Sequence, residues 1–146
     1  MIEKGHTDNY CELINIWESA VSATHGFLSE SDYKSILSQL TSYFDNVDLF
    51  IYKMDNNAVG FIGIAGDKVE MLFVHNQYRG KGIGGKLLRF AIDELHIRYV
   101  DVNEQNKPAI LFYEKFGFCG FDRSESDDEG RRYPIIKMKL KDILLC

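Results

Sequence analysis

Apolar positions along the chain recur with two different periods, so the sequence predicts a mixture of helices and strands. Spacings of three and four residues, which place side chains on one helix face, mark segments near 7–21, 29–44, 83–95 and 106–117. Short apolar runs bounded by turn residues mark strands near 2–4, 49–53, 58–65, 69–74, 97–102, 118–123 and 133–140. No repeat or linker interrupts this order, and 146 residues suit one core, so we expect a single domain over residues 1–146.

The stretch from Val69 to Leu88 joins a predicted strand to a predicted helix through a glycine-rich turn. Four glycines fall within six positions: Gly80, Gly82, Gly84 and Gly85. The free N–H groups and the dipole at a helix N-terminus favour an anion, and glycine allows a ligand to approach the backbone closely. Arg79, Lys81 and Lys86 add positive charge, so this stretch predicts a site for a phosphorylated ligand.

The composition narrows the choice of ligand and partner. The net charge of −5 argues against nucleic acid as the main partner, because binding a phosphate backbone needs a basic surface. No apolar run approaches the ~20 residues that span a bilayer, and the N-terminal residues M-I-E-K-G-H-T-D lack a signal-peptide core, so we expect a cytoplasmic protein with no membrane partner. The four histidines are scattered and the three cysteines lack metal-type spacing, so no metal is expected.

Two familiar phosphate motifs fit the glycines only in part. Gly80, Gly82 and Gly85 match G-x-G-x-x-G, and Asp101 follows at about the spacing of a ribose-binding acid. However, five polar residues separate the strand from the glycines, and the roughly 45 residues after Asp101 leave no room for a second mononucleotide-binding half. The spacing of a P-loop is also present, but Leu87 stands where Ser or Thr must bind magnesium.

A third pattern, R-x-x-G-x-G at Arg79, Gly82 and Gly84, resembles the acyl-CoA pyrophosphate loop of the GNAT acetyltransferase superfamily. Its surroundings, L-F-V-H-N-Q-Y-R-G-K-G-I-G-G-K-L-L, resemble the fourth strand and third helix of that family. About twenty residues later, N-E-Q-N-K-P-A-I-L-F-Y-E-K-F-G-F resembles its second signature, N-x-x-A-x-x-F-Y-x-x-x-G-F. The segments S-A-T-H-G-F-L-S, V-N-E-Q-N and R-S-E-S-D-D-E-G-R-R-Y-P are similar to a bacterial subgroup of small N-acetyltransferases. Asn76 departs from the proline that many relatives carry.

The resemblance implies an α/β (α+β) fold with a central mixed, mostly antiparallel sheet of six to seven strands and four flanking helices. In this family the fourth strand bulges and splays away from the fifth, which opens a slot for the pantetheine arm. The implied activity is transfer of the acetyl group of acetyl-CoA to a primary amine, by direct attack in a ternary complex, in a monomer or homodimer. A non-catalytic acyl-CoA sensor and a nucleotide-binding oxidoreductase remain the alternatives.

The resemblance also implies how acetyl-CoA is held. The pyrophosphate would contact backbone N–H groups of the glycine turn, contributed by Arg79, Gly80, Lys81, Gly82, Ile83 and Gly84. The pantetheine arm would lie along Leu72, Phe73 and Val74, and an N–H near Leu72 or Phe73 would face the thioester oxygen. Asn106 would hydrogen-bond the pantetheine amide, or serve simply as a helix N-cap, and the two roles are compatible.

The candidate catalytic residues follow from the chemistry of amine acetylation. Tyr113 is placed to donate a hydrogen bond to the departing thiolate, although it could instead be a packed helix aromatic. Glu70 is the leading proton acceptor, because partial burial would raise its pKa; the other interpretation is a solvated carboxylate. His25 is the second candidate base, with Phe27 and Asn103 expected beside the acceptor amine. The acidic run at residues 127–129 is expected to form a solvated hairpin tip.

Overall fold

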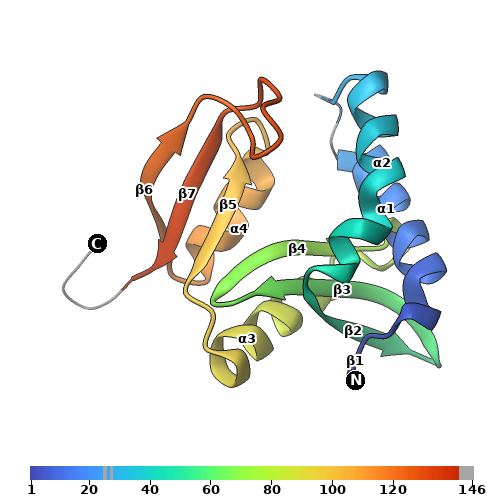
Figure 1. Ribbon diagram of the computed structural model, residues 1–146. Coiled ribbons are helices and arrows are strands. Elements are labelled where there is room, and N and C mark those ends of the chain that lie inside the picture. The colour runs from blue at the N-terminus through green and yellow to red at the C-terminus, as the bar shows by residue number, and fades with distance from the viewer. Residues whose placement is uncertain (25, 27, 142–146) are drawn as a thin grey trace.

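The computed structural model describes residues 1–24, 26 and 28–141. In this described part, seven strands form one mixed sheet in the order β1-β2-β3-β4-β5-β7-β6, and four α-helices flank it (Figure 1). The strands are β1 (Ile2–Lys4), β2 (Asp48–Met54), β3 (Asn57–Ala65), β4 (Lys68–Val74), β5 (Tyr99–Asn103), β6 (Phe118–Ser124) and β7 (Ile135–Leu140). The helices are α1 (Tyr10–Thr24), α2 (Glu30–Asp45), α3 (Ile83–Leu95) and α4 (Lys107–Lys115), with 3-10 turns at η1 (Thr7–Asn9) and η2 (Asn76–Tyr78). The expected fold class is confirmed.

The sheet divides between β4 and β5. These strands run parallel, and their register within the described residues comprises only Lys68 opposite Tyr99 and Val69 opposite Val100. Beyond that short contact the two strands diverge, and β4 and β5 form the arms of a V (Figure 1). Every other strand pair is antiparallel. The expected splaying of the fourth and fifth strands is therefore confirmed.

The expected bulge in β4 is also present, and it falls on Glu70. On β3, Gly63 lies opposite Met71 and Ile64 lies opposite Val69, so no residue of the described β3 register faces Glu70. A bulge bends its strand and redirects the side chain of the extra residue. The bend begins where β4 leaves β5, which places Glu70 at the closed end of the V, directly after Val69, the last residue paired with β5.

Among the described residues, two apolar clusters pack the helices against the sheet, one on α3 and α4 and the other on α1 and α2. One packs α3 and α4 against the sheet and includes the fully buried Leu87, Leu88 and Phe118. The other packs α1 and α2 against β2 and β3, and it contains Trp17, which is 3% exposed. Side chains of both clusters reach β4, so the strand that borders the site is supported from both faces.

Helix starts follow local hydrogen bonds. Ser29 accepts a hydrogen bond from the Asp32 N–H at 3.1 Å, which is the predicted start of α2. The first helix begins at Tyr10, three residues after the start of the predicted segment near 7–21. There the Asn9 side chain accepts from the His6 N–H at 2.9 Å, so a 3-10 turn precedes α1. No helix of the described chain is long and apolar enough to cross a membrane.

Candidate active site

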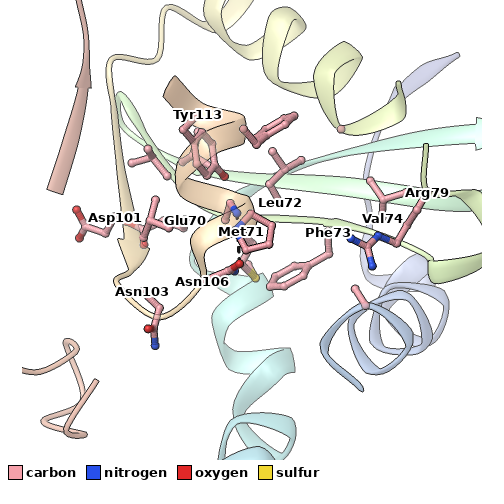
Figure 2. Close-up of a pocket in the computed structure, with 18 residues that line it drawn as sticks. Glu70, Met71, Leu72, Phe73, Val74, Arg79, Asp101, Asn103, Asn106 and Tyr113 are labelled. Atoms are coloured by element: carbon pink, nitrogen blue, oxygen red, sulfur yellow. Dashed lines mark hydrogen bonds between the residues drawn. The ribbon is translucent and has the colours of Figure 1, made fainter. Parts of the chain in front are cut away.

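A cavity of about 460 Å³ lies in the V between β4 and β5 (Figure 2). Its walls are β4, β5 and the first turns of α4. Among the described residues, nine of the predicted site residues line it: Glu70, Leu72, Phe73, Val74, Arg79, Gly84, Asn103, Asn106 and Tyr113. Residues from three segments of the sequence therefore converge on one cavity.

The glycine turn lies next to this cavity and begins α3. Gly80 and Gly82 both have φ of +78°, a left-handed conformation that side chains other than glycine adopt at a cost. A Cβ at either position would meet nothing within 4 Å, so the backbone is open to a ligand there. The Ile83 side chain is 2% exposed and belongs to the core. In the described chain Gly80, Lys81, Gly82 and Ile83 line the turn and not the cavity itself.

Tyr113 is held between two aromatic rings on the wall of the cavity. Its ring packs edge-on against Phe112 at 5.2 Å and against Phe118 at 5.6 Å between centroids. The residue is 7% exposed, and burial raises the pKa of its phenol well above the ordinary value. The hydroxyl therefore remains protonated at neutral pH and can act as a hydrogen-bond donor.

Glu70 occupies a position between buried and solvated. Its side chain is 34% exposed, and burial raises the pKa of its carboxyl above the usual range. The nearby Lys68 opposes that rise, whereas the carboxylates of Asp101 and Asp128 add to it. A carboxyl with a raised pKa accepts a proton more readily than an ordinary one.

A second cavity, of about 260 Å³, meets the first at β4. The two share Glu70, Met71, Phe73 and Asn103. Its other walls come from α1, α2 and the segment between β6 and β7, and they are mostly apolar: Trp17, Val21, Leu28, Ile36, Leu40, Tyr43, Asp127, Tyr133 and Ile135. Glu70 is therefore one of the four described residues that line both cavities.

Polar side chains tie α2 to the segment between β6 and β7, above the second cavity. The Tyr133 hydroxyl donates to the Asp32 carboxylate and accepts from the Ser29 N–H. Arg131 lies 3.8 Å from Asp32 and 3.3 Å from Asp127. The expectation of a solvated acidic tip is wrong for Asp127, whose side chain is only 22% exposed, because its carboxylate accepts from the Glu129 and Arg131 N–H groups and pairs with the Arg131 guanidinium. The hydrogen bond from Tyr133 lowers the pKa of Asp32.

The two asparagines of the site both bind backbone. Asn106 accepts from the Ala109 N–H at 3.3 Å, so its N-cap role is observed while its side chain also lines the cavity. Asn103 accepts from the Gln105 N–H at 2.8 Å. The predicted residues His25 and Phe27 lie outside the described residues.

Sequence reasoning missed several lining residues. Asp101 and Phe112 line the first cavity, and Met71 lines both. In the sequence Asp101 is an acid near the end of a predicted strand. Its spacing from the glycines suggests a ribose-binding acid and does not indicate that it lines this cavity. Glu70, a charged residue within the otherwise apolar strand β4, is the sequence feature that indicates this site.

Comparison with known proteins agrees with this geometry. A family model described as "Acetyltransferase (GNAT) domain" matches residues 45–119. The chain is 39% identical over 129 residues to "Peptidyl-lysine N-acetyltransferase YjaB" of Salmonella typhimurium, covering 87% of this chain and 88% of that protein. The chain belongs to the GNAT acetyltransferase family. YjaB of Escherichia coli is 36% identical, with 87% of each chain covered.

Solved GNAT structures share the fold. The solution structure of apo-form YjaB from Escherichia coli gives a TM-score of 0.83 at 34% identity, covering 95% of each chain. The PaiA N-acetyltransferase of Thermoplasma acidophilum, solved in complex with coenzyme A, gives 0.68 at 23% identity, covering 95% and 98%. This GNAT protein is an N-acetyltransferase of a family that uses acetyl-CoA. Because the chain belongs to this acetyltransferase family, the alternative of a nucleotide-binding oxidoreductase is no longer supported.

Proposed function

We propose that this GNAT enzyme acetylates the ε-amino group of lysine side chains in proteins, by direct attack on acetyl-CoA within a ternary complex. The observation that carries the proposal is the meeting of two cavities at the β4 bulge, with Glu70 on both. One cavity suits the thioester and the other suits the amine. The relatives named peptidyl-lysine N-acetyltransferases support this choice of acceptor. We infer a cytoplasmic single domain over residues 1–146, monomeric or homodimeric.

The first cavity fits acetyl-CoA by shape and by chemistry. Backbone groups of β4 beyond Val69 border the V, where an extended pantetheine arm can pair as an added strand. The glycine turn at the start of α3 offers free N–H groups for the pyrophosphate. The residues that would hold the molecule are Leu72, Phe73, Val74, Arg79, Gly80, Lys81, Gly82, Ile83, Gly84 and Asn106. When bound, acetyl-CoA supplies a thioester with a thiolate leaving group.

The chemistry can be followed atom by atom. Glu70 accepts a proton from the lysine ammonium, and the free amine attacks the thioester carbonyl carbon. The C–N bond forms as the C–S bond breaks, and an N–H near Leu72 or Phe73 stabilises the charge on the carbonyl oxygen. The second proton of the attacking nitrogen passes through water to the departing thiolate, so the products are the acetylated lysine, CoA thiol and protonated Glu70. Tyr113 donates a hydrogen bond to the departing thiolate. Because burial raises the pKa of Tyr113 far above that of a thiol, this bond stabilises the thiolate without full proton transfer.

The second cavity suits the stem of a lysine side chain. Its apolar walls can cover four methylene groups while the ammonium reaches Glu70. Asn103 lies on both cavities and can orient the amine. An N-terminal α-amine has no such stem, so the backbone of its own chain would have to enter the cavity.

A peptide assay tests the acceptor. A peptide with a blocked N-terminus and one lysine is compared with a free-N-terminus peptide in which arginine replaces the lysine. We expect acetylation of the lysine peptide only, located by fragmentation mass spectrometry, and its loss in Glu70→Gln. Acetylation of the free N-terminus in preference to lysine would overturn the proposed acceptor class.

A further inference from the structure

Three charged side chains gather at the closed end of the split between β4 and β5. The Lys68 Nζ lies 2.6 Å from an Asp101 carboxylate oxygen and 3.9 Å from a Glu70 carboxylate oxygen. Their side chains are 28%, 23% and 34% exposed, so water screens them only in part. Glu70 and Asp101 line the first cavity (Figure 2), whereas Lys68 is absent from the described lining of both cavities.

The backbone fixes this arrangement. In the described register the parallel pairing begins at Lys68–Tyr99 and ends at Val69–Val100, and the N–H groups of Arg98 and Tyr99 donate to the Asp67 carbonyl at 2.6 and 3.1 Å. These backbone hydrogen bonds hold the start of β4, from which the Lys68 side chain extends. The carboxylate closest to its ammonium group is that of Asp101 on β5. Because Glu70 is the bulge residue, its side chain is not constrained by a partner in the described β3 register. An anchored cation beside a less constrained carboxylate can hold that carboxylate in place.

We propose that Lys68, which is shared between Asp101 and Glu70, is a positioning residue that keeps the Glu70 carboxylate ionised at the junction of the two cavities. This inference rests on the proposed role of Glu70 as proton acceptor. Burial raises the pKa of Glu70, and Asp101 and Asp128 push it in the same direction. Lys68 is the neighbouring cation that offsets these effects, so Glu70 can be a carboxylate when the ammonium arrives.

The cation itself stays charged. Burial alone would lower the pKa of Lys68, but the hydrogen bond to Asp101 and the carboxylates around it raise it above the ordinary value. Two further charged groups face the cluster from neighbouring elements. Lys137 on β7 stands opposite Asp101 in the sheet register, and Asp127 faces Glu70 across the second cavity in a pair with Arg131. Two single substitutions in the Lys68–Asp101 pair should therefore shift the pKa of Glu70 in opposite directions, one by removing the cation and the other by removing an anion.

Carboxyl NMR of the full chain tests this arrangement directly. The ¹³C shift of the Glu70 carboxyl is followed against pH, without acceptor, in Lys68→Met and Asp101→Asn. Lys68→Met removes the cation and leaves Asp101 unpaired, so the Glu70 midpoint should rise by roughly half a pH unit or more. Asp101→Asn removes an anion and frees Lys68 for Glu70, so the midpoint should fall by a similar amount.

The controls separate charge from structure. Lys68→Arg keeps the charge and should restore a midpoint near that of the unmodified protein, and Lys53→Met, which breaks an ion pair with Glu3 on the far edge of the sheet, should not move it. Midpoints that stay fixed, or that move in the same direction in Lys68→Met and Asp101→Asn, would overturn the proposal.

A pH profile of kcat/KM distinguishes this inference from the proposed function. Its acid limb should move up in Lys68→Met and down in Asp101→Asn, following the NMR midpoints. If the midpoints move and the limb does not, the charge cluster is supported but Glu70 is not the proton acceptor. A merely structural role would lower activity in both variants without moving the limb.

Discussion

Tyr113 and Glu70 share one property at the scale of the residue: burial raises the pKa of both side chains. The consequences differ because the ordinary values differ. The phenol already holds its proton at neutral pH, so burial fixes it as a donor to the leaving sulfur. The carboxyl is normally ionised, so burial moves it toward accepting a proton from the incoming amine. The proposed mechanism thus uses Tyr113 as a donor on the acetyl-CoA side and Glu70 as an acceptor on the amine side.

Removing the Tyr113 hydroxyl tests the donor. Tyr113→Phe should lower kcat about 10- to 100-fold, because a hydrogen bond to a charged group contributes about 1.5–3 kcal/mol. The KM for acetyl-CoA should change little, since the thiolate forms only as the C–S bond breaks. Steady-state kinetics measure both constants. Tyr99→Phe removes an exposed hydroxyl outside the cavity and should retain full activity; equal losses in the two variants would contradict the role of Tyr113.

Replacing Glu70 links activity to stability. An acid whose folded-state pKa is raised contributes stability below its unfolded pKa, and this contribution is lost as pH rises through the folded pKa. Glu70→Gln should therefore lose activity at pH 7 while its Tm there is equal to or higher than that of the unmodified protein. At about pH 4 the difference in Tm should vanish. Thermal unfolding followed by circular dichroism gives both values.

Glu104→Gln is the contrasting control. The Arg123 guanidinium holds the pKa of Glu104 below its usual range, so its stabilising contribution is present at neutral pH and lost on acidification. Its Tm at pH 7 should fall with activity kept. A lower Tm in Glu70→Gln than in Glu104→Gln would contradict the assignment of Glu70 as a partly desolvated acid.

At the scale of the element, the turn before α3 combines backbone strain with ligand access. Gly82 has φ of +78° at the N-cap of α3, with open space around its Cα. Gly82→Ala should destabilise the fold by about 1–2 kcal/mol, which lowers Tm by about 2–8 °C. The added methyl group also stands where the pyrophosphate would approach, so the KM for acetyl-CoA should rise about tenfold or more.

Gly66 provides a matched control for this strain. It has φ of +62° in the turn between β3 and β4, again with nothing within 4 Å of a Cβ. Gly66→Ala should lower Tm by a similar amount and leave the KM for acetyl-CoA unchanged. A rise in that KM in both variants would show that strain, and not contact with the ligand, causes the effect.

The bridge from α2 to the segment between β6 and β7 forms another element-scale feature. It joins two segments far apart in the sequence over the second cavity, through Tyr133 and Asp32. Tyr133→Phe removes the bridging hydroxyl and should raise the KM for a lysine peptide about three- to tenfold, the effect of one hydrogen bond. The KM for acetyl-CoA should stay constant in the same assay.

Tyr10 offers the comparison for this bridge. Its hydroxyl donates to Asp45 at 2.7 Å, which also joins α1 to α2 but does so away from both described cavities. Tyr10→Phe should leave both KM values unchanged. An equal rise in the KM for the peptide in Tyr10→Phe would mean that general loosening of the helices, and not the bridge, controls acceptor binding.

At the scale of the whole molecule, the V between β4 and β5 is a weak seam in an otherwise continuous sheet. A ligand that lies along β4 adds contacts on both sides of the seam. At a concentration about 100 times its Kd, acetyl-CoA should stabilise the fold by about 2.7 kcal/mol, which raises Tm by about 5–10 °C. Thermal-shift titration measures this rise, and Gly82→Ala should need a higher concentration for the same shift. Equal stabilisation by NAD would contradict a site selective for acyl-CoA.

The sequence determined the elements, because apolar period, caps and turns act over a few residues. The start of α2 at Ser29, the N-cap at Asn106 and the glycine turn from Gly80 were all predictable on this ground. The resemblance of two motifs to GNAT signatures then predicted a site from β4 and α4. Hence the sequence predicts Tyr113, Glu70 and Leu72 as site residues, and the fold brings them together on one cavity.

Only the tertiary structure decided which charges meet. The approach of Lys68 to Asp101 depends on the parallel register of β4 with β5, and the hydrogen bond from Tyr133 to Asp32 depends on α2 lying beside the segment between β6 and β7. Neither contact has a signature in local sequence, because each joins residues through packing of whole elements. The sequence pattern of a segment predicts its secondary structure. The charges around Glu70 depend instead on which segments the fold brings together.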